Sequence, residues 1–206
     1  TYAALSSAGL EFTQAGVKKA IFGATTAIGS DTAVTTTSTD SVLRLDSTGA
    51  KAFYDANNYS HFHSTGLDVY GGGIKTAIFG ATTAIGSDTA VTTTSTDSVL
   101  RLDSTGVKAY YDANNYTHFH SAGTDIYHGG DKMAIFGTIS VIGSSTAVTT
   151  TSTDDCIRIS DGSIKLFEDA NNYTDITASG SAVWGGGNKL AIFGATTYIG
   201  NQSDAY

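Results

Sequence analysis

One segment of this chain occurs twice without a single change. AIFGATTAIGSDTAVTTTSTDSVLRLDSTG lies at Ala20–Gly49 and again, 57 residues later, at Ala77–Gly106. The same spacing carries Phe22 to Phe79, and then continues through copies that have drifted further apart. Self-similarity at a fixed period is typical of arrays in which each unit is stabilised by its neighbours. An active site is normally a single unrepeated constellation, so the repeat favours a structural protein over an enzyme.

The repeat divides the chain into three full units and two partial ones. Because the chain begins and ends within a repeat, we expect it to be a segment of a longer protein. The predicted units are residues 1–19 (the later part of a unit), 20–76, 77–133, 134–190 and 191–206 (the start of a unit).

The composition favours an all-β fold. Glu occurs only as Glu11 and Glu168, and the other strong helix formers are sparse. Thr, Val, Ile, Tyr and Phe dominate, which is typical of pleated strands. Glycines and Asp-Asn clusters mark turns that cut each unit into about seven short strands. In the first unit the predicted strands are Ala20–Ala24, Ala27–Asp31, Ala33–Thr39, Ser41–Asp46, Ala50–Asp55, Tyr59–Ser64 and Leu67–Tyr70.

Alternation along these strands predicts which side chains face an interior. Leu43 and Leu45 flank Arg44, so the leucines are expected to point inward and the arginine outward beside Asp46. Ile28 and Val69, with their equivalents, occupy two further inward positions. The residues predicted to form the core of the assembly are Leu43, Leu45, Phe53, Phe62, Leu100, Leu102, Tyr110, Phe119, Ile157, Ile159 and Phe167.

Strands this short bury one face only and cannot form a core alone, so either a single-chain solenoid or several chains around one axis must complete them. A solenoid would divide the 57 residues into similar coils, and the thirds of the repeat share no likeness. Closed cyclic symmetry also removes the exposed strand edges that invite aggregation. We therefore expect an elongated, intertwined parallel homotrimer, similar to a triple-stranded β-helix or β-prism.

Charge and composition exclude several classes of function. The formal net charge is −8 and the pI is near 4.8, which disfavours nucleic acid as a partner. No apolar run is long enough to span a membrane. The only cysteine, Cys156, stands where the earlier copies have Val42 and Val99, so we expect a buried small apolar side chain rather than a reactive thiol.

The repeat SVLRLDSTGAKAFYDANNYSHFHSTGLDVYGGG resembles repeats in the tail fibres of tailed marine and cyanobacterial bacteriophages. The shared elements are Phe53-Tyr54-Asp55, Asn57-Asn58 and Thr65-Gly66-Leu67-Asp68-Val69. They return as Tyr110-Tyr111-Asp112, Asn114-Asn115 and Gly123-Thr124-Asp125-Ile126, and the third copy departs to Phe167-Glu168-Asp169 and Gly180-Ser181-Ala182-Val183.

This resemblance covers nearly the whole chain and implies a homotrimeric tail-fibre shaft in the virion, with attachment to the host cell as the larger task. Its implied partners are further copies of itself, other tail-fibre or baseplate proteins, and a host glycan or protein that a region outside this segment binds. Two alternatives stay open: a subunit of a bacterial trimeric surface adhesin or extracellular filament, suggested by Thr26–Val34 and Thr83–Val91, and a polysaccharide-degrading tailspike. The resemblance transfers no catalytic residue.

The candidate metal ligands are His61 and His63, with His118 and His120. Pairs of this kind from three chains, converging on an axis, would give a transition metal six imidazoles. The residue between each pair is apolar in every copy, as in Phe62, so we expect it to face the core and the histidines to face solvent. No metal, cofactor or catalytic residue is therefore expected.

The remaining polar motifs have structural explanations. Asp55, Asn57 and Asn58 lack the ligand spacing of a calcium loop and suit a turn. Gly71–Gly73 is not followed by the residues of a phosphate-binding loop. The exposed aromatic residues are expected to cover outer strand faces by cross-strand pairing: Tyr54, Tyr59, Tyr70, Tyr111, Tyr116, Tyr127 and Trp184.

Overall fold

The prediction of an all-β chain is confirmed. The computed structural model describes residues 1–29, 33–86, 90–143 and 147–200, and throughout these ranges the regular elements are β-strands. None of the described residues belongs to a helix that could cross a membrane. The β-branched and aromatic side chains favour extended backbone, and the turn residues between them limit most strands to four to seven residues.

The chain forms two compact units, and the first comprises Thr1–Ser104. Its strands are β1 (Tyr2–Ser6), β2 (Gly9–Gln14), β3 (Val17–Phe22), β4 (Thr26–Gly29), β5 (Val42–Asp46), β6 (Gly49–Phe53), β7 (Tyr59–His63), β8 (Gly66–Gly71), β9 (Ile74–Gly80), β10 (Thr83–Gly86) and β11 (Val99–Asp103).

The second unit comprises Thr105–Tyr206. Its strands are β12 (Gly106–Asp112), β13 (Asn115–His120), β14 (Gly123–His128), β15 (Asp131–Phe136), β16 (Ser140–Gly143), β17 (Cys156–Ser160), β18 (Ser163–Phe167), β19 (Tyr173–Thr177), β20 (Gly180–Gly185), β21 (Asn188–Gly194) and β22 (Tyr198–Ile199).

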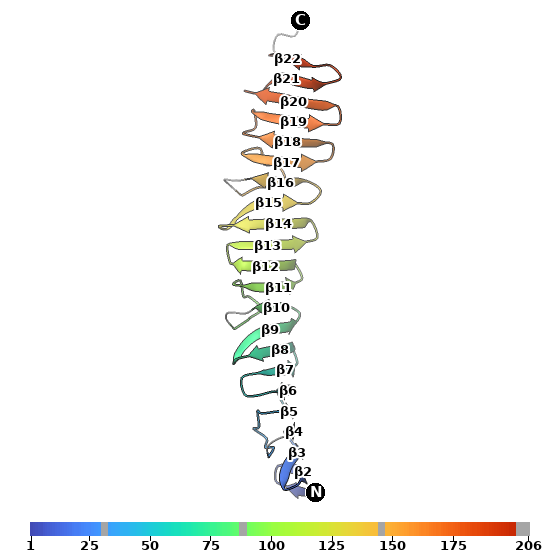
Figure 1. Ribbon diagram of the computed structural model, residues 1–206, viewed down its shortest axis with the longest axis vertical. Helices are drawn as coiled ribbons and strands as arrows, with labels where there is room; N and C mark the ends of the chain where they lie inside the picture. The colour runs from blue at the N-terminus through green and yellow to red at the C-terminus, as the bar shows by residue number, and fades with distance from the viewer. Residues whose placement is uncertain (30–32, 87–89, 144–146, 201–206) are drawn as a thin grey trace. The chain divides into compact units, whose positions relative to one another are not determined.

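Within each unit every strand pairs antiparallel with the next strand along the chain, as Figure 1 shows. Tight turns join many of these strands. Gly49 has a φ of +129° in one such turn, and a Cβ there would lie 2.0 Å from the carbonyl oxygen of Phe62. Only glycine fits that position, because its backbone both adopts positive φ and touches the neighbouring strand.

The prediction of about seven strands per repeat was wrong: within the described ranges the strand bounds recur every six strands, as from β5 to β11 to β17. The segment predicted as the strand Ala33–Thr39 leaves the sheet as a loop. The Val34 amide donates to the Lys18 carbonyl (2.9 Å), and the Thr35 amide donates to Ser38 Oγ (2.8 Å). Hydroxyl groups that bond the local backbone compete with a strand ladder, and here they close a turn.

This loop folds back over one face of the sheet and buries a small core. Val34 packs with Ala27, Val42 and Phe53, which are 9% exposed or less. The equivalent cluster in the second unit joins Val141, Val148, Cys156 and Phe167. Cys156 is a free thiol and buried, which confirms its prediction as a small apolar core residue.

Candidate interaction surface

The strand register divides each sheet into an apolar face and a polar face. On the apolar face, paired residues form a row along the middle of the strands, called here the central row. In the first unit it contains Ala3, Phe12, Ala20, Ile28, Leu43, Ala52, Ser60, Val69, Ala77, Ile85 and Leu100. In the second it contains Ala109, Thr117, Ile126, Ala134, Ile142, Ile157, Leu166, Thr174, Val183, Ala191 and Ile199.

A second row on the same face lies toward one end of the strands and is called here the ridge. In the first unit it contains Leu5, Leu10, Phe22, Thr26, Leu45, Ala50, Phe62, Leu67, Phe79, Thr83 and Leu102. In the second it contains Val107, Phe119, Thr124, Phe136, Ser140, Ile159, Ile164, Ile176, Ser181 and Phe193.

Neither row carries an ionisable side chain, and the larger residues in both are widely exposed. Leu43 is 42% exposed, Phe62 52% and Phe119 49%. Among the residues that the structure describes, the largest fully buried side chain is that of Val141. Most of the large apolar side chains of each unit are therefore partly exposed to water in the single chain.

The polar face holds the charged residues and is the more covered face of the single chain. Arg44 was predicted to point into solvent, and its side chain is covered instead; Leu43 was predicted to face the core of an assembly of several chains, and that stays a prediction. The Arg44 side chain is only 15% exposed, whereas Leu43 is 42% exposed. The reason is the Val34 loop, which covers the face that carries Arg44 and leaves the leucines uncovered.

Eight of the eleven predicted core residues lie on the apolar faces of the two units. The other three, Phe53, Tyr110 and Phe167, lie on the polar face, because Phe53 pairs with Val42 and its equivalents pair likewise with residues of that face. The prediction that all eleven share one interior was therefore wrong for these three. Phe53 and Phe167 instead belong to the small cores beneath the loops.

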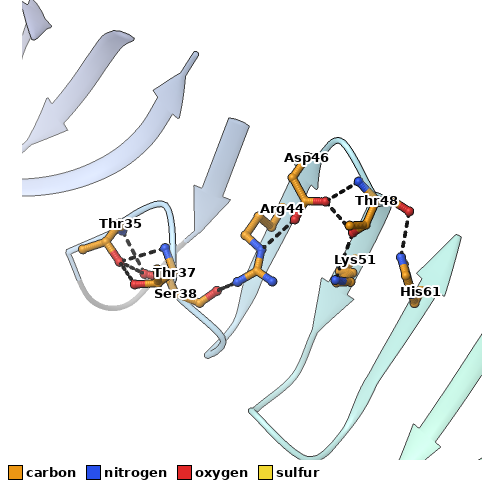
Figure 2. A network of polar contacts seen from close by, with 8 residues as sticks. All are labelled: Thr35, Thr37, Ser38, Arg44, Asp46, Thr48, Lys51 and His61. Atoms are coloured by element: carbon orange, nitrogen blue, oxygen red, sulfur yellow. Dashed lines mark hydrogen bonds and ion pairs between the residues drawn. The ribbon is translucent and has the colours of Figure 1, made fainter. Parts of the chain in front are cut away.

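Arg44 connects the loop to the sheet through the network in Figure 2. Its Nη1 donates to the Ser38 carbonyl (3.4 Å), and its Nε lies 3.5 Å from Asp46 Oδ2. The same Asp46 accepts hydrogen bonds from the amide and hydroxyl of Thr48. These hydrogen bonds hold the pKa of Asp46 below its usual range. The predicted pairing of Arg44 with Asp46 on one face is confirmed.

The histidines lie on the polar face, opposite Phe62 and Phe119, but they are half-buried rather than fully solvated. His61 Nε2 is 3.1 Å from the Thr48 carbonyl, a contact visible in Figure 2. His63 Nε2 is 3.3 Å from Asp68 Oδ2. Burial lowers the pKa of His61, and of its equivalent His118, below the ordinary imidazole value.

Asp68 is the centre of a charged cluster. It is 6% exposed, and Lys75 Nζ lies 2.6 Å from its Oδ2. That hydrogen bond raises the pKa of Lys75. The second unit repeats the cluster with His120, Asp125 and Lys132. Each acid is thus already paired with a base, which explains why a carboxylate can be buried there.

No group of three or more His, Cys, Asp or Glu side chains in the described ranges is arranged to hold a metal ion. The metal candidates His61, His63, His118 and His120 form two separate pairs, with ring centroids 4.8 and 4.7 Å apart. Within the chain they are joined to the backbone and to aspartates as described above.

Aromatic ladders, which sequence reasoning anticipated only as pairs, cross the polar face. Tyr59 stacks on Tyr70 with ring centroids 4.3 Å apart, and Phe53 lies 4.9 Å from Tyr59. Lys75 Nζ lies 5.6 Å from the Tyr70 centroid. Tyr116 with Tyr127, and Tyr173 with Trp184, repeat the stacking. Tyr54 and Tyr111 take no part in these ladders and are each 77% exposed.

Each Asp-Asn turn is hydrogen-bonded to a neighbouring glycine turn, as the turn at Asp55–Asn58 is to the turn at Gly72. Asp55 Oδ1 accepts the Asn57 and Asn58 amides, each at 2.8 Å, and Asn58 Oδ1 accepts the Gly72 amide at 2.9 Å. The hydrogen bond from the Asn58 side chain is the largest cause that lowers the pKa of Asp55. Asp55 Oδ1 and Asn58 Oδ1, which would be needed as calcium ligands, therefore already accept hydrogen bonds within the turns.

Comparison with known proteins gives no relative: the chain matches no protein-family model, and no curated protein or solved structure shows significant similarity to it.

Proposed function

We propose that this chain is a structural segment of a fibre, the shaft of a bacteriophage tail fibre, in which the apolar faces of three parallel copies pack together. The observation that carries the proposal is the uncharged apolar face left half-exposed in the single chain. Contiguous apolar patches of this extent mark interaction sites, because water exposure of so much hydrocarbon is unfavourable.

The amount of exposed surface supports self-association. The solvent-accessible surface of the chain is 11882 Å². A globular monomer of this mass exposes about 9,000 Å². The difference is larger than the area that stable interfaces bury per partner, which is about 800 Å².

Volume changes between repeats support a packed rather than a solvated face. The first copy has Ala50, Ala52 and Phe62 as neighbours on the apolar face. The third copy has Ile164, Leu166 and Ile176 in those places. Two small residues are thus replaced by larger ones where the phenylalanine is replaced by a smaller side chain. Water does not require such compensation, whereas a close-packed interior does.

Strand length supports three copies. A five-residue strand such as β5 spans about 17 Å, and sheets pack face to face about 10 Å apart. Three such sheets arranged as the sides of a triangular prism would each lie about 5 Å from the axis, which is half of that packing distance. Four sheets would leave a void.

The hydrogen bonding of the sheets favours the prism form of the trimer over exchanged strands. Each inner strand of a unit already has both neighbours from its own chain, so three complete sheets would pack side by side. The charged polar face would then be the outer surface. The assignment to a phage virion, with host attachment through other regions and neighbouring fibre or baseplate proteins, rests on the repeat motif. That motif includes the Asp55–Asn58 turn and the Gly66–Val69 step.

The test is the mass of the purified chain by light scattering and native mass spectrometry across a range of concentrations. We expect a trimer that persists on dilution. A folded monomer at micromolar concentration would refute the proposal, and a dimer would refute the prism geometry while retaining the packing of apolar faces.

A further inference from the structure

Grooves open on the apolar face at the end of the strands opposite to the ridge. In the second unit one groove of about 410 Å³ is lined by Ala109, Tyr111, Thr117, Ile126 and His128, among others. Its floor is low because Ala109 and Thr117, paired across β12 and β13, are both small. Tyr111, 77% exposed, forms one wall.

The ridge carries the matching shape at the same level of the sheet. Phe119 lies on the same strand as Thr117, near the opposite end, and 49% of it is exposed. A single chain cannot place this ring in its own groove, because Phe119 lies at the opposite end of the strand from the groove. A second copy brought face to face can do so.

We infer that Phe119 of one copy seats in the Ala109–Tyr111 groove of the neighbouring copy. This inference rests on the proposed self-association and adds its contact and its direction. When sheets are related by rotation about an axis that runs across the strands, the ridge of each faces the groove of the next. When two sheets meet in the antiparallel sense, ridge meets ridge. The groove and ridge therefore specify parallel copies in a cyclic arrangement.

The third copy of the repeat carries a compensated version of the same contact. Leu166 stands in place of Ala109 on the groove floor, and the groove is about 370 Å³. The ridge residue there is Ile176 in place of Phe119. The larger residue in the groove (Leu166 for Ala109) thus occurs with the smaller residue on the ridge (Ile176 for Phe119). This is the relation expected of two surfaces that pack against each other.

The experiment exchanges these residues within the second copy. Ala109→Leu should raise the floor against Phe119, and Phe119→Ile should leave the groove underfilled. Each change alone is expected to lower the melting temperature of the assembly. The double variant carries the residues of the third copy at these two positions and should recover most of the loss.

Mixed assemblies distinguish contact between chains from contact within one chain. Chains that carry only Ala109→Leu are refolded with equal amounts of chains that carry only Phe119→Ile, and native mass spectrometry counts the species. Random mixing gives about three mixed trimers for each pure one. Because mixing relieves the mismatch, we expect mixed trimers to exceed that ratio about tenfold.

A second mixture has the opposite expectation and needs no destabilised chain. The double variant refolded with the wild type should give fewer mixed trimers than random, because each mixed pair joins a groove to the wrong knob. A mass-tagged wild type mixed with untagged wild type provides the random control.

Random ratios in both mixtures would overturn the inference while leaving the proposed assembly intact. A wild type that stays monomeric would instead refute the proposed function itself. Failure of the double variant to assemble would also count against the inference, since its residues are those that the third copy carries in the same places.

Discussion

Leu43→Asp tests whether the apolar face is an interior of the assembled protein. Leu43 lies in the middle of the central row, paired with Ile28 on one side and Ala52 on the other. In the single chain 42% of it remains exposed. Full burial of a leucine side chain is worth about 1.5–3 kcal/mol, so assembly would bury a remainder worth about 1 kcal/mol in each copy.

The aspartate would lose that contribution and would also place a carboxylate among apolar side chains. An unpaired buried ion costs several kcal/mol, so three copies in one layer should lower assembly stability by more than about 10 kcal/mol. In the isolated chain the carboxylate would keep its water, and the cost should stay near 1 kcal/mol, the scale of strand propensity.

The assay is the mass of the variant by light scattering as a function of concentration, together with thermal unfolding. We expect Leu43→Asp to remain folded but dissociated at concentrations where the wild type is assembled. The control is Arg44→Ser on the opposite face, which removes the bond to the Ser38 carbonyl and the pairing with Asp46. It should cost about 1–3 kcal/mol of chain stability and leave the assembly state unchanged.

The result that would refute the reasoning is a Leu43→Asp protein that assembles at the wild-type concentration and melts at the wild-type temperature. A Leu43→Asp chain that is unfolded as a dilute monomer would also refute the reasoning, because the apolar face would then stabilise the single chain and not only the assembly.

Three further predictions follow from the polar face. Burial lowers the pKa of His61 and His118, so the unfolded chain takes up protons first as the pH falls below about 6.5; stability that is present above that value should be lost on acidification. A melting temperature that rises on acidification would contradict this, and replacing both histidines with Ala should flatten the profile. Val148→Ala should cost about 1.5 kcal/mol in urea unfolding and speed hydrogen exchange of the Thr149–Ser152 turn, because Val148 is 5% exposed beneath its loop; unchanged exchange would show that the loop is held otherwise. Chelators should leave the melting temperature unchanged, since His61 already bonds the Thr48 carbonyl, and a drop would reveal a metal between copies.

Local pattern alone predicted which residues share a face, but only within one strand. Leu43 and Leu45 flank Arg44 in a continuous strand, and period-2 alternation places them together. Phe53 was misassigned because its face depends on the turn between β5 and β6. That turn pairs Asp46 with Gly49, so Phe53 falls opposite Val42. A shift of one residue there would reverse the face of the whole strand.

The loop after β4 was missed because its residues have strand character. Thr35 and its neighbours are β-branched and favour extended backbone. Their hydroxyl groups also bond the local backbone, and Ser38 accepts the Thr35 amide. The signal that could have found the loop is the Thr-Ser run itself, since such residues compete with strand ladders when they occur together.

Alternation also does not predict which of the two faces of a sheet is covered by a loop of the same chain. Hydrophobicity predicts that Leu43, Phe62 and Phe53 all lie in an interior, and it does not distinguish one interior from another. The structure divides that role between two places. Beneath the loops, Val34 and Phe53 form small cores that a single chain can complete.

Among the described residues, most leucines, isoleucines and phenylalanines on the apolar face of each unit stay exposed in the single chain. The Arg44 side chain can therefore be only 15% exposed while Leu43, the residue before it in the strand, is 42% exposed. The loop cores, which include Phe53 and Phe167, are completed by residues of one chain. The apolar side chains of the other face stay largely exposed in the single chain, and that exposed surface is the physical argument for the proposed assembly.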